Sequence, residues 1–212
     1  YMDPDTAARC FKAVRAHGCA SVHIGGGEPL LRPDRLNRVL DEARNAGVGI
    51  DYVETNCAWF RDESSACRTL EGLRGRGVSC LLISISPFHA EYTPFYKTAG
   101  VISACRETGM QVFPWMDTFV SDLKALDPEK THPMEAFMER FGLDYLSEIK
   151  NRYWIHLGGR SLETFRLVFD HLPIQAILDP GGPNCSGQLL DTSHFHVDLY
   201  GSYIPGLCSG LA

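Results

Sequence analysis

The 212-residue sequence has no apolar run near the roughly 20 residues that a bilayer-spanning helix needs. It also has no excess of basic residues, because 20 Lys and Arg stand against 26 Asp and Glu, a formal net charge of -6. These two absences argue against a membrane protein and against general affinity for nucleic acid. No apolar signal-peptide segment stands at the N-terminus, so the sequence predicts a cytoplasmic protein.

Closely spaced cysteine pairs are also absent. No two cysteines form C-x-x-C, which argues against a zinc ribbon or a thioredoxin-like site. Several cysteines fall inside helical or strand patterns, where a thiol behaves as a small apolar core residue. There are eight in all: Cys10, Cys19, Cys57, Cys67, Cys80, Cys105, Cys185 and Cys208.

Nucleotide-binding glycine motifs are missing as well, although a glycine turn is present. An apolar strand-like run leads into Gly25-Gly26-Gly27-Glu28-Pro29, which matches neither G-x-G-x-x-G nor a P-loop. Glycine lets another molecule approach the main chain closely, and Pro29 forces Glu28 towards an extended conformation. The turn is predicted to present backbone groups and one carboxylate that could accept from a substrate ammonium. The alternative is an ordinary tight turn between a strand and a helix.

Strand and helix patterns alternate with a period of about thirty residues. Parallel strands joined by helices have this period, so the sequence predicts an α/β protein that is either a barrel or an open, doubly wound sheet. Strands are expected at 20–25, 48–55, 78–86 and 110–116, and helices at 2–18, before Gly47, at 62–77 and at 95–108.

The second half of the chain departs from this period. An insertion at 117–151 carries two or three helical segments, and the period then resumes. We expect a strand at 153–157, a helix capped by Ser161 that runs to about Asp170, a strand at 173–178, a loop at 179–187 and a hairpin of 195–199 with 202–205. The predicted domains are 1–180 and a small C-terminal extension at 181–212.

Polar residues fall at or just beyond the carboxyl ends of successive strands. Because this edge holds the binding site in both candidate architectures, these residues are expected to form the site. They are Glu28, Thr55, Asn56, Ser84, Ser86, Asp117 and His156.

The stretch Gly26-Gly27-Glu28-Pro29 resembles the GGEP motif of the radical S-adenosylmethionine (radical SAM) enzymes, which are partial (β/α)6 barrels of the TIM type. The resemblance covers most of residues 3–180 and implies that this motif contacts the amino group of the cofactor's methionine part. Thr55-Asn56 resembles the family's next strand end, with Cys57 where glycine is common. Ser84-Ile85-Ser86 resembles the strand whose polar residues meet the ribose and carboxylate. His89, Asp117 and His156 are expected to bind substrate or form the site wall.

One family feature is missing: the C-x3-C-x2-C loop that holds the catalytic [4Fe-4S] cluster does not occur in these 212 residues. The chain opens on a helix that follows no strand, so we expect the first strand and the cluster loop upstream of Tyr1. The resemblance then implies an enzyme that generates a 5'-deoxyadenosyl radical for C–H activation of a small-molecule or peptide substrate. Its electron donor would be a flavodoxin or ferredoxin, and this piece alone would be inactive.

Other interpretations remain open from the sequence. A natural paralogue that has lost the cluster would keep only the barrel. A conventional metal-dependent barrel enzyme would use Glu28, Asp117 and His156 as acid, base or metal ligands. A binding or scaffold domain without a cluster is the third alternative.

The C-terminal tail carries a further resemblance. Cys185, Gly201 and Cys208 resemble, in their order, an extension that holds an auxiliary iron-sulfur cluster in some radical SAM enzymes. His194 and His196 alternate onto one strand face and could contribute as ligands. The alternative is a capping hairpin with two ordinary thiols.

Overall fold

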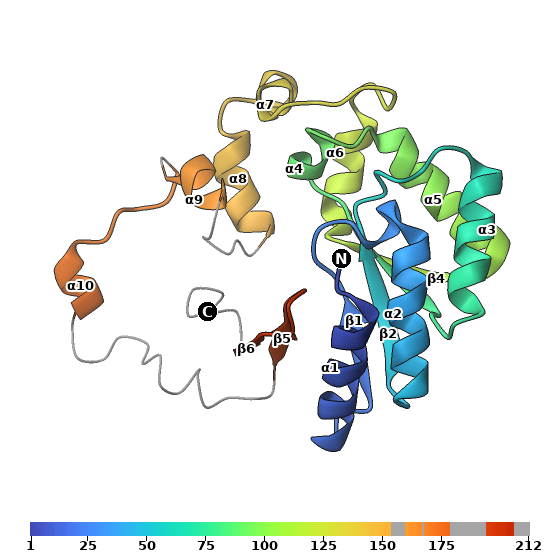
Figure 1. The fold of residues 1–212 in the computed structure, drawn as a ribbon. Helices are drawn as coiled ribbons and strands as arrows, with labels where there is room; N and C mark the ends of the chain where they lie inside the picture. The colour runs from blue at the N-terminus through green and yellow to red at the C-terminus, as the bar shows by residue number, and fades with distance from the viewer. Residues whose placement is uncertain (154–159, 167, 179–193, 206–212) are drawn as a thin grey trace. The chain divides into compact units, whose positions relative to one another are not determined.

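The computed structural model describes residues 1–153, 160–166, 168–178 and 194–205 (Figure 1). The contacts within the chain divide it into two compact units, Asp3–Tyr145 and Leu146–Ala212.

The first unit is built on a four-stranded parallel sheet with the order β1-β2-β3-β4. The strands are β1 (Ser21–Ile24), β2 (Gly49–Thr55), β3 (Cys80–Ser84) and β4 (Gln111–Trp115). Leu81 of β3 pairs with Val53 of β2 and with Val112 of β4. The expected α/β class with parallel strands is confirmed, and the strand order follows the chain without a reversal.

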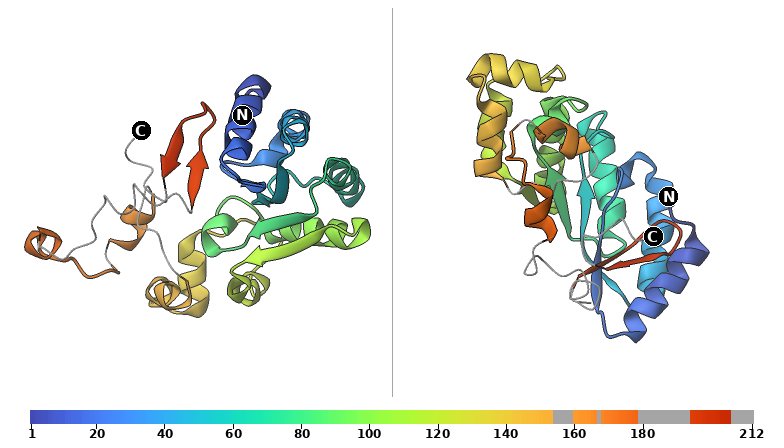
Figure 2. Two further views of the ribbon diagram at one scale, coloured as in Figure 1. Left: turned by 90° about the horizontal axis from the view of Figure 1, so that it is seen from below. Right: turned by 90° about the vertical axis from the view of Figure 1, so that its left-hand side faces the viewer.

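Four helices pack against one side of this sheet, as Figures 1 and 2 show. They are α1 (Pro4–Ala16), α2 (Pro33–Asn45), α3 (Glu63–Arg74) and α5 (Phe95–Thr108). Helix α1 contacts α2, and α3 contacts α5. Strands in sequential order with right-handed connections require this arrangement, because each connecting helix then falls on the same face. The opposite face of the sheet therefore carries none of these four helices.

Local signals in the sequence explain where the helices begin and end. The Asp3 carboxylate accepts the main-chain N–H groups of Asp5 and Thr6 at the start of α1, and Asp62 accepts that of Ser65 in α3. Such side chains satisfy N–H groups that have no partner within the helix. Helix α5 ends at Gly109, whose φ of 65° is left-handed and suits glycine. The predicted helix boundaries in this unit are therefore confirmed to within a few residues.

The core of the first unit lies between the sheet and these helices. Leu40 and Leu70 from the helices, and Val53, Leu81 and Ile83 from the strands, are at most 1% exposed. Their burial supplies the main free energy of folding, since removing apolar surface from water contributes about 25 cal/mol per Å².

The segment after β4 is helical, as expected. It contains the 3-10 helix η2 (Asp117–Phe119) and the helices α6 (Val120–Lys124), α7 (Met134–Phe141) and α8 (Tyr145–Arg152). The Tyr145 hydroxyl donates to the Asp122 carboxylate over 2.6 Å, and both side chains are buried. This bond joins α6 to Tyr145, the last residue of the first unit.

The second unit contains short elements. The strand expected at 173–178 is wrong, because Ile174–Leu178 forms helix α10. The main-chain N–H of Ala176 donates to the Pro173 carbonyl and closes the first helical turn. The stretch lacks the polar-apolar alternation of a half-buried strand, so periodicity alone could not separate strand from helix.

Other expectations for the second unit have mixed outcomes. Helix α9 (Arg160–Phe165) is shorter than expected, and Ser161 lies inside it and not at its cap. Residues 154–157 of the expected fifth strand lie outside the described residues. The expected hairpin is confirmed as an antiparallel pair of β5 (Phe195–Val197) and β6 (Tyr203–Pro205).

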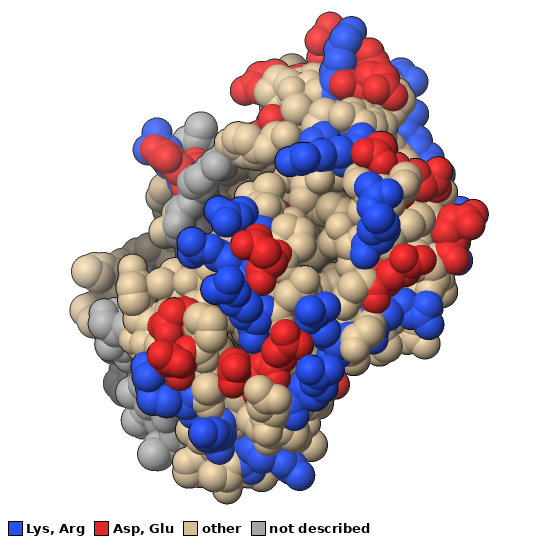
Figure 3. Space-filling view, turned by 45° about the vertical axis from the view of Figure 1, so that its right-hand side comes forward, with Lys and Arg blue, Asp and Glu red and all other residues tan. Residues whose placement is uncertain are grey.

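The surface carries charges of both signs. On the face drawn in Figure 3, basic and acidic side chains are interspersed. Among the described residues, no helix is both long enough and apolar enough to cross a membrane.

Candidate functional site

The glycine turn lies at the carboxyl end of β1. Gly26 and Gly27 have φ values of 78° and 55°, a region that favours glycine. A Cβ atom added at either position would meet no atom within 4 Å. The main chain of the turn therefore borders open space and can be approached closely by a ligand.

Glu28 holds the turn in place through its own hydrogen bonds. Its carboxylate accepts the main-chain N–H groups of Leu30 (3.0 Å) and Asn56 (2.6 Å), and the Thr55 hydroxyl lies 3.0 Å from both of its oxygens. Pro29 is buried and begins the 3-10 helix η1 (Pro29–Leu31). Glu28 thus joins the ends of two neighbouring strands, and its oxygens are directed to the chain's own donors and not to an open pocket.

Burial has the largest effect on the pKa of Glu28. Desolvation raises the pKa of the Glu28 carboxyl, while the hydrogen bonds from Asn56, Leu30 and Thr55 act in the opposite direction. Desolvation is the largest of these effects, because burial penalises the charged form. The ionised carboxylate is therefore held in this position at a cost.

The end of β2 is a compact hydrogen-bonded corner. The Thr55 hydroxyl accepts the main-chain N–H of Cys57 (3.0 Å) and the indole N–H of Trp59 (2.9 Å). The Asn56 side-chain oxygen accepts the N–H of Ala58 at 2.9 Å. Within the part of the chain that the structure describes, the Asn56 amide nitrogen has no hydrogen-bond partner, so it remains available as a donor.

Cys57, the residue after Asn56, has a backbone conformation that is typical of glycine. Its φ of 64° is left-handed, which is the conformation that glycine adopts without cost. The thiol is fully buried, and desolvation raises its pKa. A buried thiol with a raised pKa is a poor nucleophile and a poor metal ligand.

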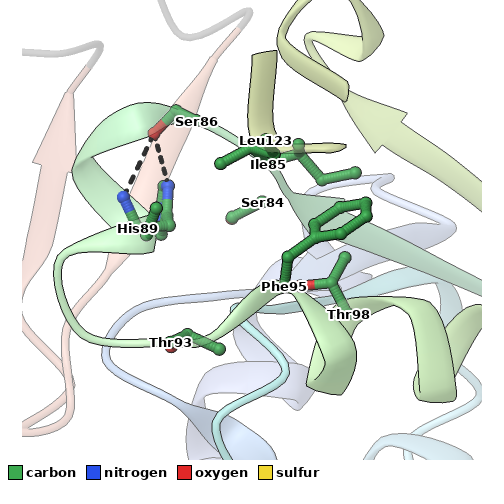
Figure 4. Close-up of a pocket in the computed structure, with 9 residues that line it drawn as sticks. Ser84, Ile85, Ser86, His89, Thr93, Phe95, Thr98 and Leu123 are labelled. Atoms are coloured by element: carbon green, nitrogen blue, oxygen red, sulfur yellow. Dashed lines mark hydrogen bonds between the residues drawn. The ribbon is translucent and has the colours of Figure 1, made fainter. Parts of the chain in front are cut away.

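The end of β3 forms a small polar cavity with α4 (Pro87–Ala90) and the start of α5, shown in Figure 4. The Ser86 hydroxyl lies 2.7 Å from Nδ1 of His89, and burial lowers the pKa of His89. The cavity volume of about 10 Å³ suits a single water molecule. Thr98, near the start of α5, also lines this cavity.

Two hydroxyl groups in this region differ in what they bind. Ser86 is buried and caps α4, whereas Ser84 is half-buried and has no hydrogen-bond partner among the described residues. Ser84 is therefore the hydroxyl of this strand end that can donate to a ligand.

The remaining predicted residues are placed less closely. Asp117 is exposed at the start of η2, directly after Met116, whose φ of 65° is unusual for a residue other than glycine. His156, Cys185 and Cys208 lie outside the described residues. The rings of His194 and His196 are 4.8 Å apart. Within the described ranges, no group of three or more His, Cys, Asp or Glu side chains could hold a metal ion.

Sequence reasoning missed three residues of the sheet. The ring of His23 in β1 stacks on that of Tyr52 in β2 with a centroid distance of 4.8 Å, and Nε2 of His23 lies 3.6 Å from the Glu54 carboxylate. Tyr52 and Glu54 are two residues apart on one strand. That spacing puts both side chains on one face of the strand and was the available signal, although the register of β1 with β2 shifts between Val22 and Ile24.

We compared the sequence with models of protein families and with curated proteins, and nothing matches in either comparison.

Proposed function

We propose that this chain is the S-adenosylmethionine-binding barrel portion of a radical SAM enzyme. The observation that carries the proposal is the open glycine turn that Glu28 fixes against the end of the next strand. A turn that is open to a ligand and rigidly held is what a main-chain binding site requires, because its donors and acceptors are then positioned before the ligand arrives.

The sheet supports the barrel part of the proposal. Its four parallel strands follow chain order with the helices on one side, as in a barrel wall. The Tyr52 and Phe113 rings are 5.5 Å apart although β3 lies between their strands. Strands two positions apart in a flat sheet are separated by roughly 9.6 Å, so the two rings lean together over β3 as on a concave surface.

The residues present fit S-adenosylmethionine. The main chain of Gly26 and Gly27 would contact the methionine ammonium, and the Asn56 amide and Ser84 hydroxyl are donors for the ribose and carboxylate. Glu28, Thr55 and Ser86 act one step away, since their side chains fix the main chain that does the binding. When bound and reduced by a [4Fe-4S] cluster, this cofactor supplies a 5'-deoxyadenosyl radical that abstracts hydrogen from a C–H bond.

The described residues do not fit the cluster itself. These 212 residues contain no C-x3-C-x2-C loop, and among the described residues no group of three or more His, Cys, Asp or Glu side chains could hold a metal ion. The proposal therefore assigns cofactor binding to this chain and derives no step through the cluster. Reduction by a flavodoxin or ferredoxin and a cytoplasmic location belong to the same proposal.

Equilibrium dialysis with radiolabelled S-adenosylmethionine tests the proposal. We expect saturable binding at one site per chain and a loss of affinity of about tenfold or more in Gly26→Val, because one charge-assisted contact contributes about that factor. The matched control is Gly18→Val. Gly18 also has a positive φ, and a Cβ atom added there would meet no atom within 4 Å. It lies before the amino end of β1, however, and the glycine turn follows the carboxyl end. Absent binding, or equal binding by Gly26→Val and the unmodified chain, would refute the proposal.

A further inference from the structure

The sheet face opposite the helices carries a carboxylate beside aromatic rings. Glu54 lies on β2, one residue before the Thr55 corner, and its side chain is 35% exposed. Within the described part of the chain its one close polar contact is His23, at 3.6 Å, which is too long for a hydrogen bond. Glu54 therefore differs from Glu28, whose oxygens accept from three groups of the chain.

The Glu54 carboxylate also borders the glycine turn. A Cβ atom added at Gly25 would lie 2.6 Å from Oε2 of Glu54, so the absence of a side chain at Gly25 makes room for this carboxylate. One oxygen thus faces His23 while the other lies against the first glycine of the turn. The charge sits at the border between the proposed cofactor site and the sheet face.

Aromatic rings extend from this carboxylate into the sheet face. His23 stacks on Tyr52 with an angle of 9° between the rings, and Tyr52 meets Phe113 edge-on at 5.5 Å. Phe113 is 38% exposed, which is unusual for a phenylalanine in the middle of a strand. A half-buried carboxylate beside aromatic rings is the combination that binds organic cations, through charge and through the ring faces.

We propose that Glu54, with Tyr52, His23 and Phe113, binds the ammonium group of an amine substrate whose apolar body lies along the rings. The inference rests on the proposed function, which puts the cofactor at the glycine turn and so leaves the adjoining sheet face to the second reactant. Charge complementarity favours this occupant, because an ammonium group supplies a permanent counter-charge to the Glu54 carboxylate that an anionic or neutral molecule cannot supply.

Benzylamine is a suitable probe because it joins an ammonium group to one ring. We expect NMR titration of the isotope-labelled chain to show benzylamine binding about tenfold or more tighter than benzyl alcohol, and no binding of benzoate. Glu54→Gln keeps the shape of the side chain and should remove this preference. Glu71→Gln, an exposed position on α3, should not.

The same variants separate this inference from the proposed function. The expected pattern is that Glu54→Gln loses benzylamine but still binds S-adenosylmethionine, while Gly26→Val loses S-adenosylmethionine but still binds benzylamine. Three results would overturn the inference: equal affinity for benzylamine and benzyl alcohol, unchanged benzylamine binding in Glu54→Gln, or loss of both ligands in a folded Glu54→Gln. The last result would assign Glu54 to the cofactor and leave the proposed function intact. Absent S-adenosylmethionine binding with benzylamine binding retained would refute only the proposed function.

Discussion

The main-chain N–H of Asn56 donates to the carboxylate of Glu28 over 2.6 Å and so joins two turns that are 28 residues apart in the sequence. Both turns follow strands of the same parallel sheet, and the bond fixes one against the other. A ligand bound at the glycine turn would therefore depend on the end of β2, although no residue of β2 belongs to the motif.

Replacing Glu28 should destabilise the fold. In Glu28→Gln the amide oxygen can still accept from Asn56, but the amide NH2 faces the N–H donor of Leu30. We expect the free energy of unfolding to fall by about 1–3 kcal/mol, the usual cost of leaving a buried polar group without a partner. Urea denaturation at pH 7 measures this change, with Glu71→Gln as the exposed control. If the free energy of unfolding falls no further in Glu28→Gln than in the control, Glu28 does not stabilise the turn through these hydrogen bonds.

The difference in free energy of unfolding between the unmodified chain and Glu28→Gln should depend on pH. The pKa of Glu28 in the folded chain lies above its ordinary value of 4.5. Between 4.5 and the raised pKa the folded chain binds more protons than the unfolded chain, so the contribution of Glu28 to stability falls as pH rises. The advantage of the unmodified chain over Glu28→Gln should therefore be largest below pH 4.5 and shrink above it. Urea denaturation of both proteins at a series of pH values measures this difference. A difference that grows as pH rises above 4.5 would contradict the raised pKa.

His89 should make the fold sensitive to acid. Burial lowers its pKa below the ordinary value of 6.5, so between the lowered pKa and 6.5 the unfolded chain is protonated and the folded chain is not. Stability from His89 is complete above pH 6.5 and is lost as pH falls below it. In His89→Asn, whose amide nitrogen replaces Nδ1 beside Ser86, this loss should be absent. A stability difference between the two proteins that stays constant from pH 5 to pH 8 would contradict this prediction.

Two thiols should be protected from alkylation by the fold. Cys57 and Cys105 are fully buried, and desolvation raises the pKa of Cys105 to about 12, so little of the reactive thiolate forms. At pH 8 we expect iodoacetamide to modify Cys19, which is half-buried, much faster than either of them. Mass spectrometry of digested samples, with and without urea, gives the rate for each cysteine. Modification of Cys57 in the folded chain at the rate of Cys19 would show that the corner after β2 opens.

A glycine inside α5 should be required for packing. A Cβ atom at Gly100 would overlap the buried ring of Phe60, so Gly100→Ala should cost about 1–3 kcal/mol despite the better helix propensity of alanine. Gly72 in α3 is the matched control, because a Cβ there meets no atom within 4 Å and Gly72→Ala should stabilise by up to about 1 kcal/mol. Thermal unfolding of the two variants should move in opposite directions. Equal shifts would contradict the close contact of α5 with Phe60.

Local patterns in the sequence determined the elements of the first unit. The carboxylates of Asp3 and Asp62, the glycines that end the helices and the apolar strand runs act over a few residues, and the structure follows them. Local patterns gave the wrong prediction at 173–178, where a short apolar run fits a strand and a helix equally well. The glycine turn was also visible in the sequence, because three consecutive glycines before an acid and a proline have few structural explanations.

Only the tertiary structure decided what the acidic residues do. Glu28 stands in the glycine motif, yet its oxygens accept hydrogen bonds from Leu30, Thr55 and Asn56. Glu54 stands outside the motif, yet its carboxylate borders the glycine turn and lies 3.6 Å from Nε2 of His23. The pairing of β1 with β2, including its register shift between Val22 and Ile24, sets these distances. Partners that lie about thirty residues apart are brought together by strand register, and register is a property of the packed sheet that no local pattern specifies.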